Sequence, residues 1–149
     1  MKEKKFLKRQ LNFDNEITLK IVGNGTQWLV EQYAYAVPSE IYINGELQGS
    51  AGKSINIEGD KNQETYVTIK FSSPITNAYR LFFYLKNIVE IDLSKFDTSA
   101  LSRMDGMFAG CTSLTSINFG NISTSSVKWM NNMFYECTSL VSLDLSNFN

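Results

Sequence analysis

"MFAGCTSLTSINFG" at residues 107–120 and "MFYECTSLVSLDLS" at residues 133–146 are two copies of one pattern, offset by 26 positions. A diverged copy precedes them, in which Phe82 lies 26 positions before Phe108, just as Phe108 lies 26 positions before Phe134. Three further sets of apolar residues share this offset: Leu85/Cys111/Cys137, Ile88/Leu114/Leu140 and Ile91/Ile117/Leu143. Repetition at a fixed period predicts stacked units that bury one common core.

Each copy divides into two segments. "LTSINFGNI" at 114–122 has the L-x-x-L-x-L spacing of a leucine-rich repeat and predicts a short strand. "DTSALSRMDGMF" at 97–108 and "STSSVKWMNNMF" at 123–134 predict short helices. Their apolar residues have the spacing i, i+3, i+6, i+7, and Thr98 and Thr124 are expected as N-caps. We therefore expect an α/β leucine-rich-repeat solenoid over 81–149, with about three repeats, the last incomplete.

Residues 13–80 predict a different, β-rich module. "EITLKI" at 16–21, "KSINIEG" at 53–59 and "TYVTIKF" at 65–71 alternate with the period of a half-buried strand. Asn44-Gly45 within "EIYINGEL" is a strong hairpin signal. We expect four to six antiparallel strands that act as an N-terminal cap on the first repeat.

Composition excludes several classes of function. The net charge is −1, which gives no reason to expect nucleic acid binding, and no apolar run is long enough to span a membrane. Histidine is absent and only two cysteines are present, so neither a common general base nor a structural zinc site is available. We expect a protein that is not an enzyme and needs no cofactor or metal.

Residues 1–12 form a basic tail, since the first ten carry five basic groups and one acidic group. This tail is interpreted as a frayed terminus or the remains of a trimmed leader, in preference to an attachment to membrane or nucleic acid.

The repeat resembles a known family. "NIVEIDLSKFDTSALSRMDGMFAGCTSLTSINFG" and "MFYECTSLVSLDLSNFN" are similar to the 26-residue MFxxCxxLxxLDLSxFDTSxVxxM repeat of the BspA-like leucine-rich-repeat surface proteins. The resemblance implies an extracellular or cell-surface location and a role in adhesion or protein binding. It covers 81–149, and departs from the family pattern at five residues: Leu101, Asn118, Gly120, Asn121 and Ser123.

The repeat register places polar residues in rows on consecutive strands. Candidate binding residues are Glu90, Asp92, Ser116, Asn118, Ser142 and Asp144. Such rows form the concave surface with which repeat proteins bind partners. A calcium ladder and a merely solvated face are the alternatives, and three oxygens in one row are too few for calcium.

The end of the last repeat is a candidate assembly surface, formed by Leu140, Leu143, Leu145 and Phe148. An uncapped apolar end predicts either a fragment of a longer array or an end that another molecule covers. Two functions remain open: a non-enzymatic surface or secreted module that binds protein or glycan, and a subunit that assembles head to tail into a filament.

Four further features carry expectations of their own, and the first two of them have two interpretations each. Cys111 and Cys137 are interpreted as buried free thiols, with a disulfide between adjacent repeats as the alternative. Trp28, Tyr33 and Tyr35 predict one face of a core strand or an aromatic ligand platform. Trp129 predicts an exposed contact patch. Asn24 lies in an N-x-T sequence and is a possible glycosylation site in a secreted eukaryotic protein.

Overall fold

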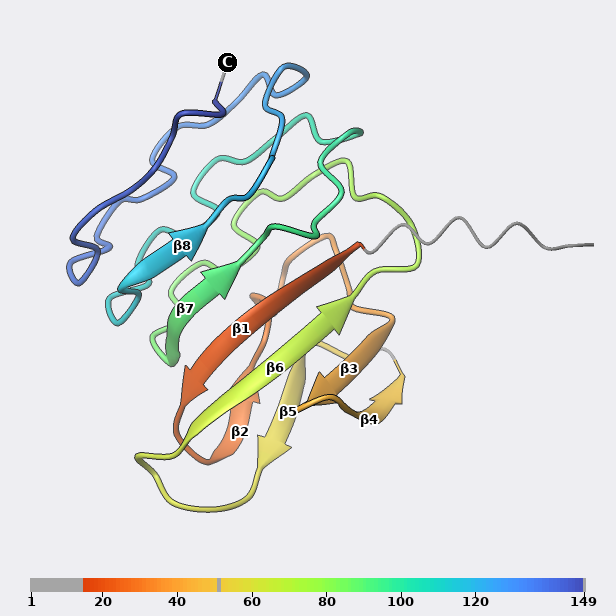
Figure 1. Ribbon diagram of the computed structural model, residues 1–149, viewed down its shortest axis with the longest axis vertical. Helices are drawn as coiled ribbons and strands as arrows, with labels where there is room; N and C mark the ends of the chain where they lie inside the picture. The colour runs from red at the N-terminus through yellow and green to blue at the C-terminus, as the bar shows by residue number, and fades with distance from the viewer. Residues whose placement is uncertain (1–14, 51, 149) are drawn as a thin grey trace, which may run out of the picture.

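A computed structural model describes residues 15–50 and 52–148 (Figure 1). These residues form eight strands and no helix. The strands are β1 (Glu16–Val22), β2 (Gly25–Trp28), β3 (Glu40–Ile43), β4 (Glu46–Ser50), β5 (Ser54–Ile57), β6 (Glu64–Lys70), β7 (Ile88–Asp92) and β8 (Ser116–Asn118). The basic tail at 1–12 lies outside the described residues.

Six strands form one mixed sheet in the order β4-β3-β6-β1-β7-β8, and β2 pairs with β5 in a second, antiparallel sheet. Only β7 and β8 are parallel; the other pairs of the large sheet are antiparallel. Strand β1 lies between β6 and β7 (Figure 1). The first strand of the repeat therefore continues the sheet of the N-terminal strands.

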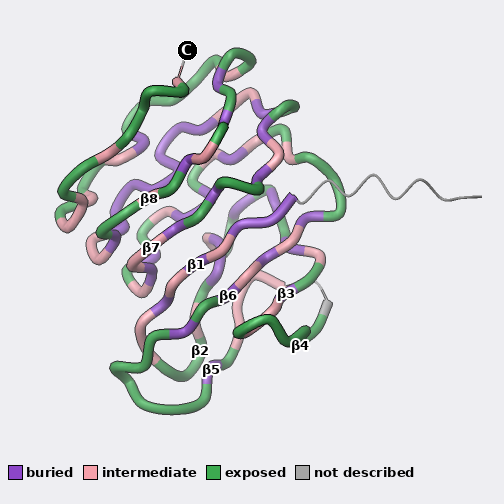
Figure 2. Tube along the Cα trace, viewed as in Figure 1, coloured by how far each residue is buried: buried purple, intermediate pink, exposed green. Residues whose placement is uncertain are grey.

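The N-terminal strands follow from their sequence patterns. In β1 the side chains of Ile17, Leu19 and Ile21 are fully buried, and the residues between them face outward. Figure 2 shows this alternation along the chain. Asn44 and Gly45 have φ angles of 49° and 87°, as a tight hairpin between β3 and β4 requires. The strands predicted at these places are confirmed.

The α/β leucine-rich-repeat solenoid is wrong. None of the described residues is helical, and the repeat contributes only β7 and β8, which belong to a mixed sheet with β1 and β6. The segments expected to be helices consist of turns and of isolated parallel bridges, which join Arg103 to Asn77 and to Trp129.

Backbone hydrogen bonding explains why no helix forms. In a helix, every amide donates within its own segment to the carbonyl four residues earlier. Here alternate amides donate to a carbonyl of the next copy: Gly106 to Asn131, Phe108 to Met133 and Gly110 to Tyr135, at 2.8–3.0 Å. The intervening amides of Met107 and Ala109 close turns onto carbonyls three residues back. Adjacent copies thus satisfy each other's backbone hydrogen bonds. Turns that repeat in this way give the apolar residues the same spacing that a helix would give them.

The expected helix caps have another role. The amides of Leu101 and Val127 donate to the backbone carbonyls of Thr98 and Thr124, which closes turns. The buried Thr98 hydroxyl accepts a hydrogen bond from the amide of Ser123 in the next copy, at 3.2 Å. This threonine therefore connects copies and caps no helix.

Left-handed backbone recurs at the repeat period in these turns. Gly106 and Gly110 have φ angles of 59° and 77°. Their equivalents one copy earlier and one copy later also have positive φ, although they are not glycine: Arg80, Tyr84, Asn132 and Glu136. A left-handed residue is costly inside a helix, which is a second reason why the segment is built from turns.

The core of the repeat is a stack of aromatic rings. The ring centroids of Phe82 and Phe108 are 5.8 Å apart, and those of Phe108 and Phe134 are 5.7 Å apart, with nearly parallel planes. Phe119 contacts Phe108 edge to face at 6.2 Å. Residues at equivalent positions of adjacent copies therefore do lie over one another in this part of the chain.

Candidate binding surface

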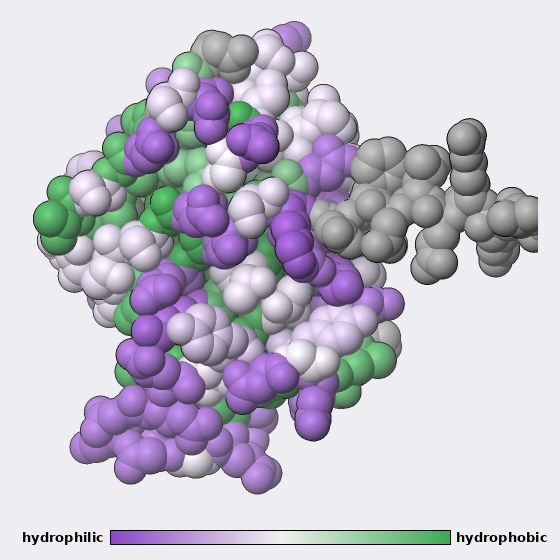
Figure 3. All heavy atoms as spheres, in the orientation of Figure 1, coloured by the Kyte–Doolittle hydropathy of each residue, from purple (hydrophilic) through white to green (hydrophobic). Residues whose placement is uncertain are grey.

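The outward face of the six-stranded sheet is polar and spans both parts of the chain. One row consists of Tyr42, Thr68, Thr18, Asp92 and Asn118, which are aligned on β3, β6, β1, β7 and β8 by the strand register. Figure 3 shows this side of the molecule, where hydrophilic residues gather over the lower part of the sheet and the loop before β6.

A second row runs beside the first. Tyr66, Lys20, Glu90 and Ser116 are aligned on β6, β1, β7 and β8. The two rows border an open hollow of about 300 Å³, whose floor includes Ile91 and Ile117. A hollow of this size with polar walls can accept a side chain or a short polar segment of a partner.

Lys20 is the electrostatic centre of this hollow. Its Nζ lies 2.9 Å from a Glu64 carboxylate oxygen and 3.2 Å from a Glu90 oxygen, and 5.9 Å from the Tyr66 ring centroid. The hydrogen bonds to the two carboxylates raise the pKa of Lys20 above its usual range. Lys20 is thus held as a cation between two anions, and because the carboxylates outnumber it this part of the face has a net negative charge.

Asp92 is the carboxylate of the hollow without a cationic partner among the described residues. Its Oδ1 accepts hydrogen bonds from the amide of Ser94 at 2.8 Å and from the side-chain amide of Asn118 at 3.1 Å. Its side chain is exposed. Asp92 thus offers a fixed carboxylate to a hydrogen-bond donor of a partner.

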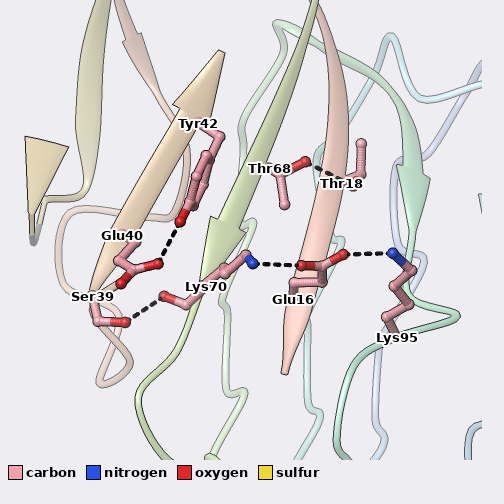
Figure 4. Close-up of polar contacts among 8 residues, drawn as sticks. All are labelled: Glu16, Thr18, Ser39, Glu40, Tyr42, Thr68, Lys70 and Lys95. Atoms are coloured by element: carbon pink, nitrogen blue, oxygen red, sulfur yellow. Dashed lines mark hydrogen bonds and ion pairs between the residues drawn. The ribbon is translucent and has the colours of Figure 1, made fainter. Parts of the chain in front are cut away.

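A third row at the far end of the face is an ion-pair bridge (Figure 4). The nearly buried Glu16 carboxylate lies 2.9 Å from Lys95 Nζ and 3.2 Å from Lys70 Nζ. Burial raises the pKa of Glu16, but the hydrogen bonds from Lys95 and Lys70 outweigh this effect and lower it overall. The bridge joins β6, β1 and the turn after β7, so it fixes the N-terminal strands to the repeat.

The structure brings together four of the six candidate residues: Glu90 and Asp92 on β7, and Ser116 and Asn118 on β8. Ser142 and Asp144 are exposed, but residues 141–145 form no strand and β8 pairs with β7 alone. The described residues contain no group of three or more potential metal ligands.

Sequence reasoning missed the part of the face that comes from β1 and β6. Thr18, Lys20 and Tyr66 border the same hollow as the repeat residues, yet the sequence assigned them to a separate cap. Their alternation with buried residues predicted that they face outward, but nothing in the pattern indicated that β1 pairs with β7.

The end of the last copy is partly open. Leu140, Leu143 and Phe148 are half-buried and Leu145 is exposed. At the equivalent positions of the preceding copy, Leu114 and Phe119 are buried. The ring of Phe148 packs on Phe119 with a centroid distance of 5.0 Å, so this residue closes part of the core itself.

Both thiols are free. Cys111 donates its S–H to the carbonyl of Phe82 at 2.9 Å, and Cys137 donates to the carbonyl of Phe108 at 3.1 Å. Burial raises the pKa of the Cys111 thiol to about 12, so it remains protonated at neutral pH. Each cysteine thus gives a carbonyl of the preceding copy a second hydrogen bond beside that from a backbone amide, which is a structural role.

The aromatic residues of the N-terminal part do not share a core strand. Trp28 ends β2 and is 40% exposed, whereas Tyr33 and Tyr35 lie in the loop before β3 and are 80% and 74% exposed. The interpretation of these three residues as one face of a core strand is wrong. Asn24 is exposed beside β2, and its side-chain amide donates to the carbonyl of Gly59 at 2.7 Å.

The residues that the structure describes include no helix, and therefore none that could span a membrane. In comparisons with known proteins, a family model described as "Mycoplasma protein of unknown function, DUF285" matches residues 59–149. Neither the curated proteins nor the solved structures gave a match to this chain.

Proposed function

The chain belongs to the family described as Mycoplasma protein of unknown function, DUF285, and we propose that it is a non-enzymatic surface or secreted module that binds another protein. The outward face of the six-stranded sheet is the proposed binding face. The observation that carries the proposal is the polar row that continues across β3, β6, β1, β7 and β8 around the hollow at Lys20 and Asp92.

Two further points support a binding role. The similarity of the repeat to the BspA-like surface proteins favours adhesion at a cell surface. The charged groups of the face are held in place by neighbours, as Lys20 is by Glu64 and Glu90, so a partner would meet a preorganised surface. Preorganisation lowers the cost of ordering side chains on binding.

The test is binding of the full chain to a panel of purified extracellular matrix and serum proteins, measured by biolayer interferometry. The variant carries Asp92→Ala and Asn118→Ala, two exposed residues whose removal leaves the core unchanged. A matched control carries Asp60→Ala and Asn62→Ala, which lie in an exposed loop away from the hollow. The proposal predicts that the first variant weakens binding about tenfold or more and that the control does not.

Equal binding by both variants would refute the choice of this face. Failure of the wild-type chain to bind any member of the panel would count against an adhesive role. Thermal unfolding of both variants checks that neither change has altered the fold.

A second candidate function is head-to-tail assembly through the end of the last copy. The partly exposed Leu140, Leu143, Leu145 and Phe148, together with the almost fully exposed Val141, favour it. Sedimentation velocity over a range of concentrations tests it: the wild type should form larger species, and Val141→Glu with Leu145→Glu should remain monomeric. A wild type that stays monomeric at the highest concentration rules this assembly out.

A further inference from the structure

Arginine and aromatic side chains alternate on the surface of the turns that precede the repeat strands. Arg103 lies over the rings of Trp129 and Tyr79, at 5.9 and 4.4 Å from the ring centroids. Arg80 lies over Tyr79 and Phe83, at 5.1 and 4.2 Å. We call these five residues the arginine–aromatic ladder. Stacking holds the flat guanidinium groups in position without using their N–H groups.

The ladder runs between two adjoining hollows, of about 400 and 380 Å³. Tyr79, Arg80 and Phe83 line both, so the two hollows form one groove. Tyr33 and Tyr35, from the loop before β3, line its second half. None of these residues lines the hollow on the sheet face.

The aromatic rings along the groove are unusually exposed. Tyr33, Tyr35 and Tyr135, which line it, are 80%, 74% and 58% exposed, and Trp129, which belongs to the ladder but lines neither hollow, is 49% exposed. Side chains exposed to this degree contribute little to the core. An exposed cluster of Tyr, Trp and Arg is typical of a binding surface.

The charges of the groove balance. Its charged lining residues are Arg80, Arg103, Glu31 and Asp105, so its formal charge is zero. Arg103 Nε lies 2.7 Å from Asp105, and the other oxygen of Asp105 accepts a hydrogen bond from Asn131 at 2.9 Å. A neutral groove gives no electrostatic attraction to nucleic acid or to a strongly acidic polymer.

The polar groups of the groove are mixed donors and acceptors. Arg80 has no carboxylate partner among the described residues and offers donors, Glu31 offers a carboxylate oxygen, and Asn132 offers both kinds of group. Sugar hydroxyls donate and accept at the same time, and the C–H faces of sugar rings pack flat on aromatic rings. Flat rings, paired donors and acceptors, and zero net charge are the features that a neutral oligosaccharide requires.

We propose that the arginine–aromatic ladder and its groove form a binding site for a neutral oligosaccharide. The site is separate from the sheet face, so this inference does not depend on the proposed function. Arg80 donates to hydroxyls, the tyrosine rings on either side stack on sugar rings, and Asp105 positions Arg103 and Asn131.

The test has two stages. The full chain is first applied to a printed array of neutral and acidic oligosaccharides. The neutral array member bound most strongly is then titrated against the wild type and the variants, with saturation-transfer NMR and calorimetry as readouts. The principal variant carries Tyr33→Ala and Tyr35→Ala, which are exposed enough to be removed without disturbing the core. Arg80→Lys keeps the charge but removes the flat stacking group.

The matched control is Tyr66→Ala, which removes a half-exposed tyrosine from the sheet face. We expect the double tyrosine variant to bind the neutral sugar about tenfold more weakly, Arg80→Lys to bind it more weakly, and the control to bind it as the wild type does. Asp92→Ala with Asn118→Ala should also keep sugar binding, which distinguishes this site from the sheet face.

Three results would overturn the proposal. The first is that no neutral member of the array binds at millimolar concentration. The second is binding that the groove variants leave unchanged. The third is a preference for the acidic members of the array over the neutral ones, because the argument depends on the balanced charge of the groove.

Discussion

The ring stack at the centre of the repeat predicts that one residue type at equivalent positions contributes very different amounts to stability. Phe108 is fully buried between Phe82 and Phe134, and Phe119 contacts its edge. Phe134 occupies the same repeat position and also contacts Phe119 edge to face, but it is half-buried and stacks on Phe108 alone among the described rings. Phe108→Ala removes a ring enclosed by the core, which costs about 4 kcal/mol in free energy of unfolding.

Phe134→Ala is the matched control, since the same atoms are removed one repeat later. Its expected cost is about 2 kcal/mol, because part of its ring is already in water. Urea unfolding followed by circular dichroism measures both free energies, and the larger loss should lower the melting temperature by about 10 °C. Equal costs for the two variants, or a larger cost for Phe134→Ala, would refute the reasoning that the copies stack in this order.

Three further predictions follow from single contacts. Gly110→Ala should destabilise the chain more than Gly106→Ala in thermal unfolding, because its new Cβ would meet the Tyr84 ring at 2.5 Å, whereas at Gly106 the nearest atom is 3.5 Å away. Glu16→Gln should be less stable than the wild type at neutral pH. Because the pKa of Glu16 is lowered in the folded chain, the stabilisation from its carboxylate is present above pH 4.5 and is lost as pH falls through the folded pKa. Urea unfolding should therefore show that the difference in free energy of unfolding between the wild type and the variant shrinks on acidification. Cys111→Ala should cost about 2 kcal/mol in urea unfolding, since the Phe82 carbonyl loses one of its two hydrogen bonds and a small cavity forms.

The arginine–aromatic ladder and its groove show which surface positions could be predicted from the sequence and which could not. The sequence placed Trp129 on the surface, and the structure confirms that its side chain is exposed. The sequence assigned Tyr33 and Tyr35 to a core strand and gave no role to Arg80 or Arg103. These residues come from a loop and two repeat copies, and only folding brings them together.

The binding face was predicted in part for a similar reason. The repeat register determined that Asp92 and Asn118 lie side by side, because the repeat period can be measured in the sequence itself. The repeat register could not determine that Thr18 pairs with Asp92. That pairing joins distant parts of the chain, and it depends on which edge of the N-terminal strands is unpaired and can accept β7.

The sequence by itself determined the period, the apolar positions that stack, the alternating strands of the N-terminal part and the hairpin at Asn44-Gly45. Only the tertiary structure decided between helix and turn, because the same apolar spacing suits both. The choice depends on whether an amide finds its acceptor within its own segment, one helical turn earlier, or on the adjacent copy of the repeat. Here the adjacent copy supplies the acceptor, so turns and a mixed sheet replace the helices.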